Sequence, residues 1–170
     1  MLIPMEVVGV RIEMPSNQPI VLLKEREGSR FLPIWVGATE ATSIAFAQQG
    51  LTATRPLTHD LFVDLLQRLD ATLSAVHITE IVDGIFYAQL QLRDSAMTLL
   101  PLSARPSDAI ALALRTHSAI LASSDLLDSV GINIPERALE GTGEATPEST
   151  EELAAFREFL EGINPEDFAG

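Results

Sequence analysis

The chain has 170 residues and a net charge of −13, with 24 acidic and 11 basic side chains. It has no cysteine, which excludes disulfides, thiolate metal sites and cysteine nucleophiles. No apolar run approaches the roughly 20 residues that a membrane span needs, and the amino terminus lacks the basic start of a signal peptide. We therefore expect a cytoplasmic protein without a membrane partner.

The negative charge is concentrated near the carboxyl end. Residues 1–135 hold 14 acidic and 9 basic side chains, whereas residues 136–170 hold 10 acidic and 2 basic ones. An acidic protein repels nucleic acid at long range, so a nucleic-acid role would need a local basic site or a divalent metal. An apolar fraction of 46% and a mean hydropathy of +0.21 favour apolar surface buried between subunits. We expect a homo-oligomer, most simply a dimer.

The amino-terminal part of the chain has the alternating pattern of β-strands, which we predict at 5–14, 20–24 and 30–36. A helix over 40–49 follows, with Thr39 as its expected cap. A second helix begins at an Arg-Pro pair, has Thr58 as its expected cap, and carries leucines at helical spacing up to Leu69.

Three further strands are predicted at 72–81, 85–92 and 97–102, the first two joined by a tight Asp-Gly turn. The pair Arg105-Pro106 then disfavours helix at Arg105, and Ser107 is the expected cap of an alanine-rich helix that reaches Arg115. Residues 120–127 continue with apolar and helical character.

Three strands followed by a helix therefore occur twice. The two helices align from Thr39 and Ser107 onwards, so that Glu40 matches Asp108. We interpret this as a duplicated β3α unit; a chance similarity between two alanine-rich helices is the alternative. The predicted fold class is α/β, of the α+β type, with mixed or antiparallel sheets and helices packed against them.

The carboxyl end is predicted to be separate from the domain over residues 1–135. Residues 136–148 are small, acidic and glycine-rich, as in a flexible linker. Residues 149–152 form a capping box, and an apolar stripe follows at Leu153, Phe156, Phe159, Leu160 and Ile163. We expect this amphipathic helix over 149–170 to dock on its own domain or on a neighbouring subunit, with a separate protein as the less favoured alternative.

Three motifs, in this order, resemble the bifunctional nuclease (BFN) domain family. They are Leu-Pro-Ile-Trp-Val-Gly at 32–37 with Glu40 after it, Arg-Pro-Leu-Thr-His-Asp at 55–60, and Ala-Arg-Pro-Ser-Asp-Ala-Ile-Ala-Leu-Ala at 104–113. The resemblance covers about residues 5–132, and the acidic tail is similar to that of actinobacterial members. It implies an oligomeric α/β fold and nuclease activity on DNA and RNA. Ser103 stands where many relatives have an acid, which leaves one fewer carboxylate for a metal.

The motifs hold the residue types that phosphodiester hydrolysis uses. His59 is a candidate acid or base, and Asp60 and Asp108 are candidate catalytic carboxylates. Together with Glu40, the two aspartates offer the oxygen ligands that Mg²⁺ or Mn²⁺ prefers.

Two arginines in the motifs are candidate phosphate-binding groups. Arg55 and Arg105 could each bind a phosphate through two hydrogen bonds. The alternative is structural, with Arg55 and Arg105 paired to Asp60 and Asp108 at the starts of two helices. The chain has no P-loop and no dinucleotide-binding fingerprint.

The first hypothesis is therefore a low-specificity nuclease that hydrolyses DNA, RNA or both with the help of a divalent metal. The alternative is a non-catalytic oligomeric binding or regulatory protein that uses its acidic surface and its carboxyl-terminal helix. A third hypothesis is a sensor that binds an anionic metabolite through the arginines. The nuclease hypothesis requires the charged residues of the motifs to converge.

Overall fold

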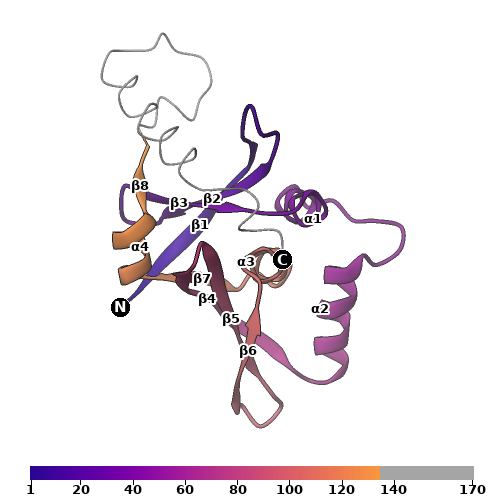
Figure 1. Cartoon of the computed structure of the whole chain (residues 1–170). Helices are drawn as coiled ribbons and strands as arrows, with labels where there is room; N and C mark the ends of the chain where they lie inside the picture. Colours follow the sequence, from indigo (N-terminus) through magenta and orange to yellow (C-terminus); the bar gives the residue numbers. More distant parts are fainter. Residues whose placement is uncertain (135–170) are drawn as a thin grey trace, which may run out of the picture.

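The computed structural model describes residues 1–134, which form eight strands and four helices of the predicted mixed α/β class (Figure 1). The strands are β1 (Leu2–Ile12), β2 (Pro19–Glu25), β3 (Arg30–Trp35), β4 (Thr72–Val82), β5 (Ile85–Arg93), β6 (Leu99–Ala104), β7 (Ala119–Ser123) and β8 (Ile132–Asn133). The helices are α1 (Ala38–Gln48), α2 (Thr58–Arg68), α3 (Pro106–Thr116) and α4 (Ser124–Val130). None of these four helices is long and apolar enough to cross a membrane. The predicted linker and carboxyl-terminal helix lie outside the described residues.

The strands form one sheet in the order β6-β5-β4-β7-β1-β2-β3-β8. The two predicted three-strand units are antiparallel meanders, β1-β2-β3 leading to α1 and β4-β5-β6 leading to α3. Strand β7 joins them, because Ile120 pairs with Met5 of β1 in an antiparallel ladder and with Val76 of β4 in a parallel one. The arrangement of strands and helices matches the predicted repeat, and a single strand from late in the chain closes the sheet between its halves.

The helical character predicted over 120–127 is wrong for the first part of that segment. Ala119–Ser123 is strand β7, and α4 begins only at Ser124. The burial of β7 alternates along the strand, but its sequence, Ala-Ile-Leu-Ala-Ser, has no polar residue before Ser123. A short apolar run of this kind cannot be distinguished from a buried helix by periodicity alone. Ser123 ends the strand and starts the helix, because its hydroxyl accepts a hydrogen bond from the Leu126 N–H at 3.1 Å.

The hydroxyl residues predicted as helix caps are not in cap positions. The N-cap residues of α1, α2 and α3 are Gly37, Leu57 and Arg105, and Thr39, Thr58 and Ser107 lie inside the first turns. Pro106 occupies the first position of α3, where its missing N–H has no helical partner to lose. The start of α3 therefore places Arg105 at the helix entrance and buries Ser107 behind it.

Helices α1 and α3 pack against each other, and α2 packs against α3. Alanines are buried on both packed helices, with Ala41 at 6% exposure and Ala109 and Ala113 at 0% and 1%. Because these side chains are small, the helix backbones can approach closely. The polar residues of the three helices are therefore near enough to bond to one another.

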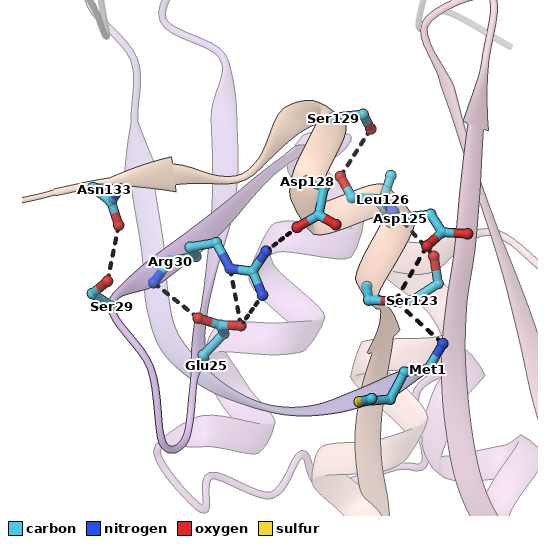
Figure 2. Close-up of polar contacts among 11 residues, drawn as sticks. Met1, Glu25, Ser29, Arg30, Ser123, Asp125, Leu126, Asp128, Ser129 and Asn133 are labelled. Carbon is cyan, nitrogen blue, oxygen red and sulfur yellow. Dashed lines mark hydrogen bonds and ion pairs between the residues drawn. The ribbon is translucent and has the colours of Figure 1, made fainter.

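At the other end of the sheet, Arg30 joins β3 to the end of the described chain (Figure 2). Its Nη2 donates to Glu25 Oε1 at 2.6 Å, and its Nη1 pairs with Asp128 of α4. Ser29 donates a hydrogen bond to Asn133 of β8 at 3.0 Å. The hydrogen bonds from Arg30 lower the pKa of Glu25, although burial of that carboxylate acts in the opposite direction.

Replacing Glu25 by glutamine should lower the free energy of unfolding at neutral pH, because it removes the charge that Arg30 stabilises. The pKa of Glu25 is lower in the folded chain, so this contribution is present above its ordinary value of 4.5 and is lost as pH falls through the folded value. In urea unfolding, the difference between Glu25→Gln and the wild type should therefore shrink from about pH 7 to about pH 3. Glu27→Gln, on the exposed turn, is the control. An equal difference in the free energy of unfolding at both pH values would contradict the lowered pKa of Glu25.

Candidate active site

A hydrogen-bonded chain of side chains crosses all three packed helices. Ser43 Oγ of α1 lies 2.8 Å from His59 Nδ1 of α2, and His59 Nε2 lies 2.9 Å from Asp108 Oδ1 of α3. Ser43 is 6% exposed, and the side chains of His59 and Asp108 are 13% and 30% exposed. The chain therefore runs from a buried hydroxyl to a carboxylate that water can reach.

Arg105 extends this chain to the surface. Its Nε and Nη2 donate to Asp108 Oδ2 and Oδ1 at 2.7 and 3.1 Å, and Nη2 also donates to Glu40 Oε1 at 2.8 Å. These bonds use the Nε–Nη2 edge of the guanidinium and leave Nη1 without a bond to any of residues 1–134. The Arg105 side chain is 58% exposed, so carboxylates fix one edge of a guanidinium that, among the described residues, is otherwise accessible.

The carboxylate at the centre of this cluster is ionised at neutral pH. Burial raises the pKa of Asp108, but the hydrogen bonds from Arg105 and His59 outweigh burial, and the net shift is downward. The same contact with Asp108 raises the pKa of Arg105, which stays charged. An ionised carboxylate can only accept hydrogen bonds, so His59 must present an N–H at Nε2.

Gly37 leaves the space that Glu40 occupies. A Cβ atom at position 37 would lie 2.4 Å from Glu40 Oε2, closer than such atoms can approach. The backbone of Gly37 has φ −67°, which any residue adopts, so the requirement here is space and not conformation. The glycine of the first motif therefore allows the Glu40 carboxylate to lie against the helix start, where it meets Arg105.

A second arginine, Arg115, adds to the hydrogen bonds that join the three helices. Arg115 is 10% exposed, and its Nε donates to Asp60 Oδ1 at 2.6 Å. Its Nη1 donates to the backbone carbonyls of Ser43 and Ala111 at 3.1 and 3.0 Å. The hydrogen bond from Arg115 lowers the pKa of Asp60, against the effect of burial, and the Leu57 N–H donates to the other Asp60 oxygen at 2.9 Å.

The structure connects five of the six residues predicted from the sequence. Glu40, His59, Asp108 and Arg105 belong to one cluster, and Asp60 joins it through Arg115 and Ser43. The expected alternative pairing of Arg105 with Asp108 is present, whereas Asp60 pairs with Arg115 in place of Arg55. Arg55 is exposed and makes no hydrogen bond or ion pair within residues 1–134.

Sequence reasoning missed Ser43 and Arg115, the two residues that connect the cluster. Both could have been found from helical spacing. Ser43 lies one turn after Glu40, and Arg115 lies two turns after Asp108, so each shares a helix face with a residue already selected. Their partners are far away in the sequence, and no spacing within one helix predicts those.

The predicted metal ligands do not fit a resident divalent ion in this arrangement. Glu40 and Asp108 both bind Arg105, and Asp60 binds Arg115, so each of the three carboxylates already has an arginine as its partner. Within residues 1–134, no group of three His, Cys, Asp or Glu side chains is placed to hold a metal ion. We therefore derive no step through a metal, and the metal requirement stays a prediction.

Comparison with known proteins places these residues in a recurring domain. The family model described as the bifunctional nuclease domain matches residues 21–135, a range that contains all six predicted site residues. An uncharacterised protein of Mycobacterium tuberculosis is 43% identical over 162 residues, which are 95% of each chain. The bifunctional nuclease 1 of Oryza sativa subsp. japonica and the bifunctional nuclease of Oryza minuta are each 26% identical over 128 residues. Those residues are 74% of this chain but 39% of each plant protein.

Arg115→Met should destabilise the fold by about 2–4 kcal/mol, because methionine keeps the apolar stem but donates no hydrogen bond to Asp60 or to the two carbonyls. Urea unfolding at neutral pH measures the effect. Arg68→Met, in the last turn of α2, is the matched control and should change the free energy of unfolding by less than about 1 kcal/mol. Equal effects of the two substitutions would show that Arg115 does not hold the helices together.

Proposed function

This chain belongs to the bifunctional nuclease domain family, and on that premise we propose that it is a low-specificity nuclease that hydrolyses phosphodiester bonds of DNA, RNA or both. The observation that carries the proposal is the cluster formed by His59, Asp108 and Arg105 at the meeting point of three helices. It places an imidazole ring and an exposed guanidinium each within hydrogen-bond distance of one ionised carboxylate. Acid–base groups and a fixed cation are what phosphodiester cleavage requires of a protein.

In this proposal, the arginines bind the substrate. The Arg105 side chain is 58% exposed and its Nε–Nη2 edge is held by Glu40 and Asp108, so Nη1 can meet a phosphate oxygen with little further ordering. Arg55 lies exposed just before α2 and provides a second cation for the phosphate backbone of the nucleic acid. Local cations are needed, because the net charge of −13 repels nucleic acid at long range.

The acid–base work is assigned to the hydrogen-bonded pair of His59 and Asp108. Their 2.9 Å contact lets the two groups act as one unit. Asp60 has both oxygens occupied, by Arg115 and by the Leu57 N–H, and we assign it the role of holding the first turn of α2 in place. His59 lies in that same turn.

An exposed apolar row on α2 supports the proposed homo-oligomer. Leu57, Leu61, Leu65 and Leu69 are between 39% and 65% exposed and recur every four residues. Such a row on one side of a helix is typical of a surface that packs against another chain. The same surface would serve the alternative function, a non-catalytic binding protein.

Nuclease assays with purified protein test the proposal. At least one of single-stranded DNA, double-stranded DNA and RNA should be cleaved, and Asp108→Asn and His59→Ala should each lower kcat by at least about 100-fold. Asp64→Asn, which removes an exposed carboxylate of α2, should leave the rate unchanged. Parallel assays in Mg²⁺, Mn²⁺ and EDTA decide the metal requirement.

Two outcomes of these assays would count against the nuclease. Equal cleavage by the wild type and by both site variants would point to a contaminating enzyme or to a different site in the protein. No cleavage of any substrate, at any enzyme concentration and with either metal, would favour the non-catalytic binding protein.

A further inference from the structure

His59 has no free ring nitrogen in this structure. Ser43 is bonded at Nδ1 and Asp108 at Nε2, and the ring side chain is 13% exposed. A histidine that takes a proton from water or from a ribose hydroxyl must place one nitrogen against that group. To do so here, the ring would have to give up one of two short contacts in a mostly buried place.

The charge of Asp108 fixes where the hydrogen of the ring lies. Because the carboxylate is ionised and only accepts, the hydrogen of the neutral ring is on Nε2, and Nδ1 is the acceptor. The hydroxyl of Ser43 then donates to Nδ1. If the ring gains a proton, Nδ1 becomes a donor, and the same hydroxyl can accept without moving.

Ser43 is built in as a fixed partner. It is 6% exposed, so it is shielded from a substrate at the surface, and its backbone carbonyl is held by Arg115. The other end of this hydrogen-bonded line of side chains is accessible to solvent. There Asp108 and Arg105 reach solvent.

We propose that Ser43 is a positioning residue that holds the His59 ring at Nδ1 so that the Nε2 hydrogen stays directed at Asp108, and that His59 acts through Asp108 instead of contacting the nucleic acid itself. In this arrangement Asp108 and Arg105 meet the substrate phosphate and its attacking group. His59 holds the carboxylate from behind, and Ser43 holds His59. The inference rests on the proposed nuclease function for its activity test, but not for its spectroscopic one.

Substitution of His59 separates a positioning role from a general-base role. In His59→Gln, the side-chain amide nitrogen can donate to Asp108 as Nε2 does, but the amide cannot take up a proton at neutral pH. We expect His59→Gln to keep kcat within about tenfold of the wild type, while His59→Ala loses about 100-fold or more. Both variants are first checked for folding by thermal unfolding. If His59→Gln folds and is as inactive as His59→Ala, then His59 is the base and the inference is wrong.

Nitrogen-15 NMR of the His59 ring tests the role of Ser43 without any turnover. In the wild type with a neutral ring, Nε2 should have the shift of a protonated nitrogen and Nδ1 that of an unprotonated one. Ser43→Ala should leave the hydrogen on Nε2 but move the Nδ1 shift, because Nδ1 loses its hydrogen-bond donor, and it should lower kcat about tenfold with KM unchanged. Thr42→Ala is the matched control, because the Thr42 hydroxyl bonds only to the Ala38 carbonyl of its own helix.

The outcomes keep the two proposals apart. A hydrogen on Nδ1 in the wild type, or an unchanged ring spectrum in Ser43→Ala, would overturn the role of Ser43 whether or not the protein cleaves nucleic acid. An inactive protein would contradict the proposed nuclease function, and with it the action of His59 on a substrate. If its ring spectrum still shows the expected tautomer and the expected change in Ser43→Ala, the role of Ser43 in positioning His59 is supported.

Discussion

The candidate site depends on one nearly buried cation. Arg115 bonds to α1 through the Ser43 carbonyl, to α2 through the Asp60 carboxylate, and to its own helix α3 through Ala111. A buried guanidinium is costly unless its donors are matched, so the three helices must keep the spacing at which all three acceptors meet it. That spacing is what brings Ser43, His59 and Asp108 into one hydrogen-bonded line. The arginine thus acts on the site through the position of helices and not through contact with a substrate.

The repeated β3α arrangement accounts for the shape of the cluster. Glu40 and Asp108 occupy equivalent places in the two repeated helices, and both bind Arg105. At the same offset, Ser43 and Ala111 are equivalent, and both carbonyls accept from Arg115. The arginines come only from the second unit, because positions 37 and 47 of the first unit are glycine and alanine. Helices α1 and α3 present similar acceptors, and both arginines that bond to these acceptors come from the second unit.

Local pattern predicted most of the fold, since the two meanders and their helices follow from alternation and helical spacing. Local pattern gave wrong predictions where contacts between distant parts of the chain determine the local structure. Strand β7 became clear only once its neighbours β1 and β4 were known, and a hydroxyl near a helix start is a cap only if the backbone turns at that residue. For the site, the motif residues were found from residue type. The pairing of Asp60 with Arg115, 55 residues away, was not, because nothing local distinguishes Arg115 from Arg55 as a partner.

The place of β7 has a consequence for the order in which the protein matures during synthesis. Both meanders and all three helices of the site precede residue 119, yet the sheet has no direct pairing between β4 and β1. The two halves become one sheet only when Ala119–Ser123 has left the ribosome and inserted between them. Contacts this distant in sequence form late in folding. A nascent chain therefore carries every residue of the cluster before it has the strand that joins the two halves of the sheet.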